Sequence, residues 1–127
     1  MIRGVRFASI PVTDQDRALK FYTETLGFRL VTDRPFSEEQ RWIELRIPGA
    51  ETRLVLFRFG EELKPGRQIN VSFWTDDVEG TVRELKRKGV TILVEPKKVD
   101  WGTAAIFGPG RQPVSCRDEV SEASLLP

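Results

Sequence analysis

The chain has 127 residues, a formal net charge of +1 and 31% charged residues, which are ordinary values for one folded domain. This charge argues against nucleic acid or an anionic membrane surface as a partner, and no apolar run approaches the roughly 20 residues of a membrane span. The N-terminus has no apolar signal-peptide core, and the single cysteine, Cys116, cannot form an intrachain disulfide, so a cytoplasmic location is expected.

Residues 2–60 predict the order strand, helix, strand, strand, strand. Residues 5–12 alternate with period two, which is typical of a strand. Thr13 opens a Thr-Asp-Gln-Asp sequence that resembles a helix capping box, and Gly27 suits the left-handed residue that ends a helix. Further strands are expected over residues 28–32, 41–47 and 53–59, with a polar loop over residues 33–40.

After a linker-like segment at residues 60–66, the pattern repeats. A strand is expected at residues 68–75, a second capping box at 76–79, a helix, and strands at 90–94, 101–107 and 114–116. Glu95-Pro96 is expected to break the chain between two of these strands. The second helix has a stripe of apolar residues and a glycine stop: Val78, Val82, Leu85 and Gly89.

The two halves can be overlaid. Placing Thr13 on Asp76 puts Leu19 on Val82, and a gap of one residue then aligns Gly27 with Gly89. The overlay predicts an α+β fold with two copies of one βαβββ module. Each helix should cover one face of its sheet, so the opposite face is the expected pocket wall. That face carries Phe7, Ser9 and Pro11 in the first copy, and Asn70, Ser72 and Trp74 in the second.

Residues 9–28 closely resemble the first module of the vicinal oxygen chelate superfamily, which includes glyoxalases, bleomycin-resistance proteins and extradiol dioxygenases. Residues 74–79 and 88–90 resemble the second module, and residues 101–107 its penultimate strand. The resemblance implies one domain, residues 1–127, with βαβββ modules at 2–60 and 67–117. Their curved mixed sheets would surround a central cavity. The chain departs from the family pattern after Phe107, so residues 118–127 are expected to be a non-family tail.

The resemblance also implies four positions for metal ligands. They fall on Phe7, on Val55, on Asn70 and, with a poorer alignment, on Ser115. None of these residues has a carboxylate or an imidazole, and the sequence contains no histidine at all. We therefore expect no metal and no cofactor. The same composition excludes a His/Cys zinc site and a Ser-His-Asp triad.

The positions expected to bind a ligand combine aromatic, small polar and aliphatic side chains. They are Phe7, Ser9, Trp42, Val55, Phe57, Asn70, Ser72 and Trp74. An aromatic lining could also include Phe36, Phe59 and Trp101, although ordinary core packing explains each aromatic residue singly. Trp42 could instead be a dimer contact, and a water-filled sheet face would explain Asn70, Ser72 and Trp74 equally well.

Catalytic residues are otherwise unknown, and Glu44 is the one weak candidate for a general base. The simpler interpretation is a charge paired with Arg46 or Arg53, and the sequence favours it.

The resulting hypothesis is a metal-free protein that binds an apolar or aromatic small molecule, as the drug-sequestering members of the family do. No acidic cluster lies on the cavity-facing positions, which disfavours a strongly cationic drug. One alternative is a divalent-metal-dependent lyase, isomerase or dioxygenase. Another is a structural or regulatory dimer whose cavity has collapsed onto Phe7, Phe57 and the tryptophans. A homodimer is expected in any case, because the sheets leave edges to cover.

Overall fold

The computed structural model describes residues 1–58, 71–99, 102–108 and 114–117. The chain divides into two compact units, Met1–Lys64 and Pro65–Pro127, and each is described by itself. The described residues do not include the expected linker at 60–66 or the expected tail at 118–127. They also do not include three candidate site residues: Phe59, Asn70 and Trp101. No helix in the described segments is long and apolar enough to cross a membrane.

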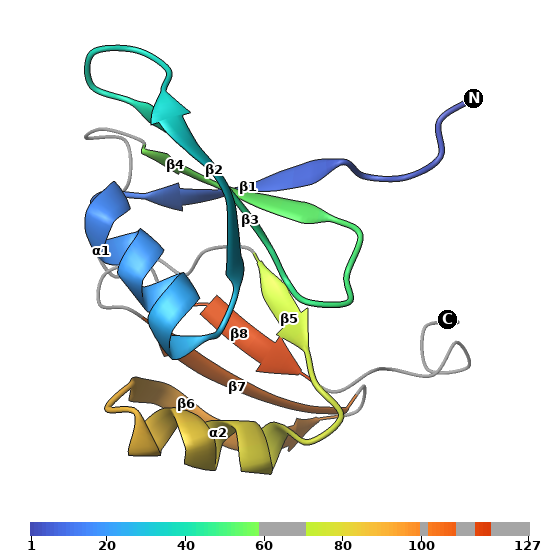
Figure 1. Cartoon of the computed structure of the whole chain (residues 1–127). Helices are drawn as coiled ribbons and strands as arrows, with labels where there is room; N and C mark the ends of the chain where they lie inside the picture. Colours follow the sequence, from blue (N-terminus) through green and yellow to red (C-terminus); the bar gives the residue numbers. More distant parts are fainter. Residues whose placement is uncertain (59–70, 100–101, 109–113, 118–127) are drawn as a thin grey trace. The chain divides into compact units, whose positions relative to one another are not determined.

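The first unit is a strand, a helix and three further strands, in the predicted order (Figure 1). Its elements are β1 (Phe7–Val12), α1 (Gln15–Lys20), the π-helical turn η1 (Phe21–Thr25), β2 (Arg29–Pro35), β3 (Arg41–Arg46) and β4 (Arg53–Arg58). The strands form one mixed sheet in the order β1-β4-β3-β2, in which only β1 and β4 are parallel. The predicted α+β class and βαβββ module are confirmed here.

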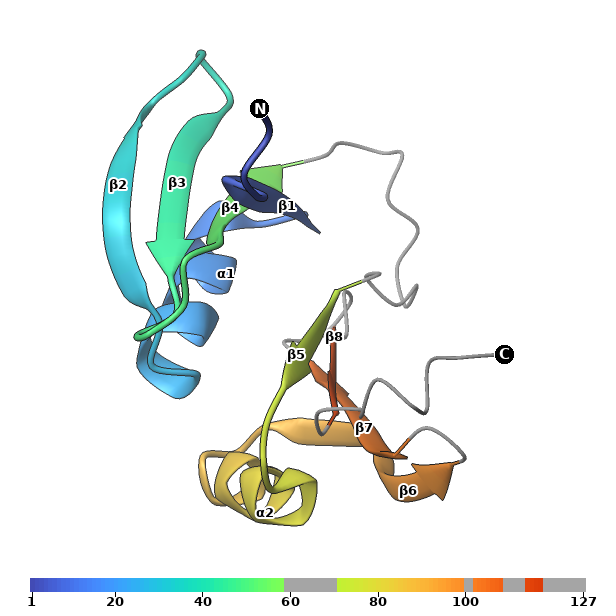
Figure 2. The same cartoon turned by 90° about the vertical axis from the view of Figure 1, so that its right-hand side faces the viewer.

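The helix of this unit packs on one face of the sheet (Figure 2). Alternate strand residues on that face are buried: Ile10, Val12, Ile43, Leu45, Leu54 and Leu56. From the helical segment, Ala18 and Tyr22 complete this core. Burying each large aliphatic side chain stabilises the fold by about 1.5–3 kcal/mol, so the apolar half of the strand alternation determines which face the helix covers.

Both helices begin one residue later than predicted. Asp14 is the N-cap of α1, and its carboxylate accepts a hydrogen bond from the Arg17 backbone N–H at 3.1 Å. In the second unit, Asp77 accepts from the Gly80 N–H at 2.9 Å. A carboxylate satisfies a free N–H and also complements the positive end of the helix, which explains why Asp14 is used rather than Thr13. Because both caps shift equally, the overlay of the two halves is unchanged.

The one-residue gap in that overlay has a structural cause. The first helix passes into η1, where the Leu26 N–H donates to the Phe21 carbonyl, five residues earlier. A π-turn accommodates one extra residue in a helix, whereas α2 (Val78–Arg87) remains α-helical throughout. The glycine stops are confirmed, because Gly27 and Gly89 have φ angles of 78° and 83°.

The second unit repeats the element order. It contains β5 (Ser72–Trp74), α2, β6 (Thr91–Val99), β7 (Gly102–Gly108) and β8 (Val114–Arg117), and its sheet order is β5-β8-β7-β6. The predicted apolar stripe of α2 is buried: Val78, Val82 and Leu85.

The first strand begins at Phe7 rather than at residue 5, β5 ends at Trp74 rather than at residue 75, and two predicted strand ends are wrong by three residues or more. The strand β6 continues through Pro96, because it is an edge strand and the register shifts between Val94 and Lys97, where a missing N–H is tolerated. The loop predicted at residues 33–40 begins only after Pro35, because β2 is also an edge strand and tolerates a proline. The edge strand β2 extends to Pro35, and the Arg41–Asp33 ion pair holds its end.

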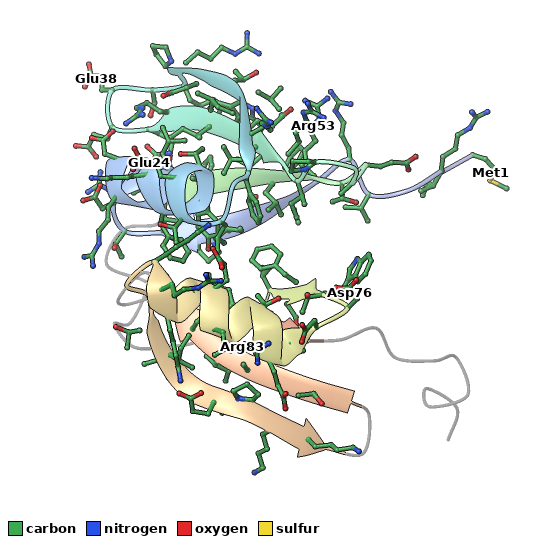
Figure 3. The ribbon with its side chains drawn as sticks, turned by 60° about the horizontal axis from the view of Figure 1, so that its bottom comes forward. Met1, Glu24, Glu38, Arg53, Asp76 and Arg83 are labelled. Carbon is green, nitrogen blue, oxygen red and sulfur yellow. The ribbon has the colours of Figure 1, made fainter. Side chains whose placement is uncertain are left out.

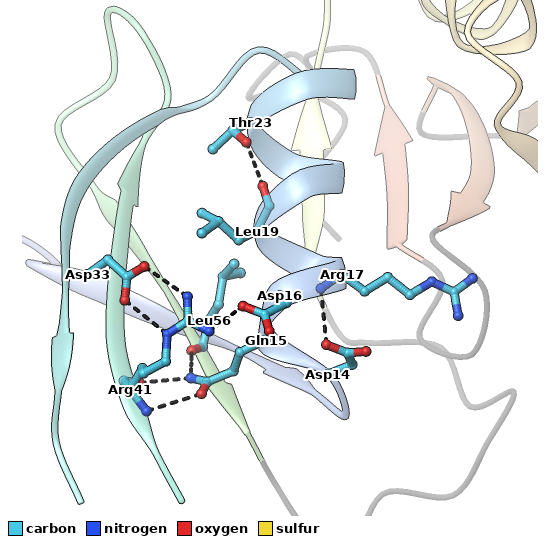
Figure 4. Close-up of polar contacts among 9 residues, drawn as sticks. All are labelled: Asp14, Gln15, Asp16, Arg17, Leu19, Thr23, Asp33, Arg41 and Leu56. Carbon is cyan, nitrogen blue, oxygen red and sulfur yellow. Dashed lines mark hydrogen bonds and ion pairs between the residues drawn. The ribbon is translucent and has the colours of Figure 1, made fainter.

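A buried amide attaches α1 to the sheet (Figure 4). The Gln15 Nε2 group donates to the Arg41 carbonyl at 2.8 Å and to the Leu56 carbonyl at 2.9 Å. Its Oε1 accepts from the Arg41 N–H at 3.1 Å. Gln15 is only 7% exposed, so these three bonds hold the start of the helix against β3 and β4 away from competing water.

Replacing this amide with an apolar side chain of similar size should destabilise the protein. We expect Gln15→Met to lower the free energy of unfolding by about 2–3 kcal/mol, because strand backbone groups lose a buried partner. Gln40→Met is the matched control, because the half-buried Gln40 forms the same kind of hydrogen bonds to the Arg58 backbone, but these bonds are exposed to solvent. The control should lose less than about 1 kcal/mol in urea unfolding. Equal losses for the two variants would contradict this role for Gln15.

An ion-pair network also connects β2, β3 and α1. The Arg41 guanidinium donates to Asp33 through Nε at 3.1 Å and Nη2 at 2.8 Å, and it also contacts Asp16. This hydrogen bonding lowers the pKa of the Asp33 carboxyl, against a smaller opposing effect of burial.

Because the folded-state pKa of Asp33 is lowered, its stabilising effect is present above the unfolded-state pKa and is lost as the pH falls through the folded-state pKa. Asp33→Asn should therefore cost up to about 1 kcal/mol at pH 7 and progressively less below about pH 4. Urea unfolding at several pH values checks this, with the exposed Glu51→Gln as control. A cost that stays constant down to pH 2 would refute the linkage.

Candidate functional site

The candidate site is the face of the first sheet opposite α1. Directly paired strand residues point to the same side of a sheet, so the register assigns each residue to a face. The face opposite α1 carries Phe7, Ser9 and Pro11 from β1, Arg53, Val55 and Phe57 from β4, Trp42, Glu44 and Arg46 from β3, and Arg29, Thr32 and Arg34 from β2.

Four rings form an aromatic cluster on this face: Phe7, Phe36, Trp42 and Phe57. The Trp42 ring meets the Phe7 ring edge-to-face at 5.4 Å between centroids and the Phe57 ring at 6.4 Å. The Phe36 ring lies 5.9 Å from Trp42 and 6.1 Å from Phe57. Each such contact contributes about 0.5–1.5 kcal/mol beyond burial, so the rings hold one another in place.

The aromatic cluster remains partly exposed. Phe7 is 40% exposed and Phe36 is 63% exposed, whereas Val55 is fully buried. In the register, Val55 lies diagonally between Phe7 and Trp42, so the two rings meet above it. The face therefore has a packed base and an apolar surface with two accessible rings, the kind of patch that marks a contact site for another molecule.

The carboxylate of this face is occupied by an ion pair. Glu44 accepts from Arg53 at 3.1 Å between Oε2 and Nη1, and the two side chains are 13% and 36% exposed. Of the two partners considered from the sequence, Arg46 and Arg53, the cross-strand one is used. This cross-strand ion pair is the simpler of the two interpretations of Glu44, and it connects β3 to β4.

The structure thus brings together five of the predicted ligand-binding residues on one face: Phe7, Ser9, Trp42, Val55 and Phe57. In the second unit, β5 presents Ser72 and Trp74 on one side and the half-buried Phe73 on the other. Ser72 is exposed, and Trp74 is 70% exposed.

Of the four positions at which the resemblance implies metal ligands, Phe7 and Val55 have side chains in the described part of the chain. The side chains of Phe7 and Val55 have no atom that can coordinate an ion. Asn70 and the Ser115 side chain lie outside the described part of the chain. Within the described part, no three His, Cys, Asp or Glu residues are grouped to hold a metal.

The single thiol is not an activated nucleophile. Cys116 is buried, and this burial raises the pKa of its thiol, while a backbone hydrogen bond at Ala105 acts in the opposite direction. Reactive cysteines need a lowered pKa and access to solvent, so Cys116 serves as a core residue of the second unit.

Comparison with known proteins identifies the family. The profile of the Glyoxalase/Bleomycin resistance protein/Dioxygenase superfamily matches residues 4–120, and the chain belongs to this superfamily. The uncharacterized protein YetH of Bacillus subtilis (strain 168) is 37% identical over 109 residues, covering 84% of this chain and 90% of YetH. The uncharacterized protein YurT of the same organism is 34% identical, covering 78% of this chain and 85% of YurT.

Two solved structures are similar over nearly the whole chain. A superfamily member from Sphaerobacter thermophilus DSM 20745 has a TM-score of 0.81 and 32% identity, covering 93% of this chain and 98% of that one. TnmS3, an antibiotic binding protein from Streptomyces sp. CB03234, has a TM-score of 0.79 and 34% identity, covering 94% and 98%.

Proposed function

We propose that this protein binds an apolar or aromatic small molecule against the aromatic cluster, without a metal ion. The observation that carries the proposal is the pair of accessible rings, Phe7 and Phe36, supported by Trp42 and Phe57 on the face opposite α1. The similarity to TnmS3, an antibiotic binding protein, supports the same class of function.

The cluster supplies the forces that such a ligand needs. Covering apolar surface contributes about 25 cal/mol per Å², and ring edges and faces orient an aromatic ligand. The exposed Ser9 hydroxyl, one row from Phe7, can form a directed hydrogen bond. Because the rings already pack on one another, little side-chain ordering opposes binding.

Binding of a neutral fluorescent probe, N-phenyl-1-naphthylamine, tests the proposal. We expect saturable binding by the wild-type protein and a dissociation constant raised about fivefold or more by Phe36→Ala and by Trp42→Leu, because each removes ring contact. Leu30→Ala is the control, since Leu30 is 49% exposed but lies in the register on the other face of the sheet. Circular dichroism verifies folding. Absence of saturable binding, or an equal effect of the control, would overturn the proposal.

The absence of a metal is tested separately. Purified protein should contain far less than one divalent ion per chain by elemental analysis, and added Mn²⁺, Ni²⁺ or Zn²⁺ should not raise the melting temperature. A stoichiometric ion, or a rise in stability that saturates with metal, would instead support the metal-dependent lyase, isomerase or dioxygenase.

The finer predictions about assembly stay predictions. We propose that the chain forms a homodimer and that its modules pair around a shared cavity to which Asn70, Ser72 and Trp74 contribute. Light scattering checks the dimer, and the effect of Trp74→Ala on probe binding checks the contribution of β5. A dimer that does not bind the probe would favour the structural or regulatory alternative.

A further inference from the structure

We propose that the ligand is an anionic aromatic molecule, whose carboxylate, sulfonate or phosphate group is held by a row of arginines beside the aromatic cluster. The row consists of Arg29, Arg46 and Arg53. The inference rests on the proposed function, because it specifies the chemistry of the ligand at the same face.

The strand register places the three arginines side by side. Arg29 of β2 pairs with Arg46 of β3, and Arg46 pairs with Arg53 of β4. Arg53 pairs in turn with Phe7 of β1. Neighbouring strands lie about 4.8 Å apart, and paired side chains share a face. The guanidinium groups can therefore reach one bound anion, and the Phe7 ring lies next to them in the same row. Arg53 is labelled in Figure 3.

The charges on this face do not balance. The face carries four arginines, which are the three of the arginine row and Arg34. It carries one carboxylate, that of Glu44. Glu44 is paired with Arg53. Among the described residues, Arg29 and Arg46 have no ion-pair partner, and both are exposed. Like charges directly opposite one another on a sheet are unfavourable, so a bound anion would relieve repulsion that the free protein retains.

The distance between the aromatic cluster and the arginine row allows one ligand to contact both. Trp42 and Phe57 lie four residues along their strands from Arg46 and Arg53, about 13 Å at the usual strand rise. Phe7 lies beside Arg53, and Val55 lies between Arg53 and Phe57 on β4. A flat molecule of two or three fused rings with an acidic group at one end can therefore cover the aromatic cluster while its anion meets the arginine row. Guanidinium groups suit carboxylate and phosphate because they donate two parallel hydrogen bonds.

Three ligands of similar size test the charge preference: naphthalene-2-carboxylate, its planar isostere naphthalene-2-carboxamide, and 2-naphthylmethylammonium. We expect the wild-type protein to bind the carboxylate about tenfold more tightly than the amide, and the ammonium compound least tightly. This preference should decrease as the salt concentration rises. Isothermal titration calorimetry measures the dissociation constants.

The decisive variant is the double substitution Arg29→Gln and Arg46→Gln. Both residues are exposed, so the fold should be retained, and the ratio between the amide and carboxylate dissociation constants should fall to within about twofold. Arg17→Gln is the matched control, because Arg17 is an exposed arginine of α1 whose side chain extends away from the sheet contacts in Figure 4. The control should keep the wild-type ratio.

The possible failures are distinguishable. Equal binding of carboxylate and amide by the wild-type protein would overturn the anionic ligand and leave the proposed aromatic binding intact. A charge preference that survives the double substitution would overturn the role of Arg29 and Arg46. Binding of none of the three ligands would overturn this inference, and the proposed function as well if N-phenyl-1-naphthylamine also fails to bind.

Discussion

The Gln15 amide is the contact on which the arrangement of the first unit depends. It satisfies backbone groups of both β3 and β4 from the first turn of α1, and Gln15 itself is only 7% exposed. A helix attached there must cover Ile43, Leu45 and Leu56, because these residues share its side of the strands. The period-two alternation then leaves aromatic and charged residues on the other face. The alternation thus separates the core from the candidate site, and the Gln15 contact holds the helix on the core side.

The two faces also differ in how their charges are used. On the side of α1, Arg41 is balanced by Asp16 and Asp33, so its role is to connect elements. On the opposite face, Glu44 balances only Arg53, and the remaining arginines have no carboxylate partner in the part of the chain that the structure describes. Stability accounts for the first arrangement but gives no reason for the second. The proposed anionic ligand would supply that reason.

The comparison of the two units shows how a local irregularity can be detected from sequence. The overlay of the two halves requires one extra residue before Gly27, and the structure places a π-turn in that helix and none in α2. The caps show the opposite situation. The sequence predicts both caps one residue early, because Thr-Asp and Asp-Asp pairs offer two adjacent acceptors and the capping-box pattern does not select between them.

The sequence by itself determined the family, the order of elements, the helix stops at Gly27 and Gly89, and the residues that alternate toward each face of a strand. These features are local, because capping, glycine conformation and periodicity act over a few residues. Only the tertiary structure decided which residues of different strands are neighbours. Arg29, Arg46 and Arg53 are separated along the chain, and a register shift lies between Leu30 and Thr32, so their alignment could not be read from periodicity. The choice of Arg53 rather than Arg46 as the partner of Glu44 has the same origin, because the pairing of backbone hydrogen bonds between strands sets which side chains meet.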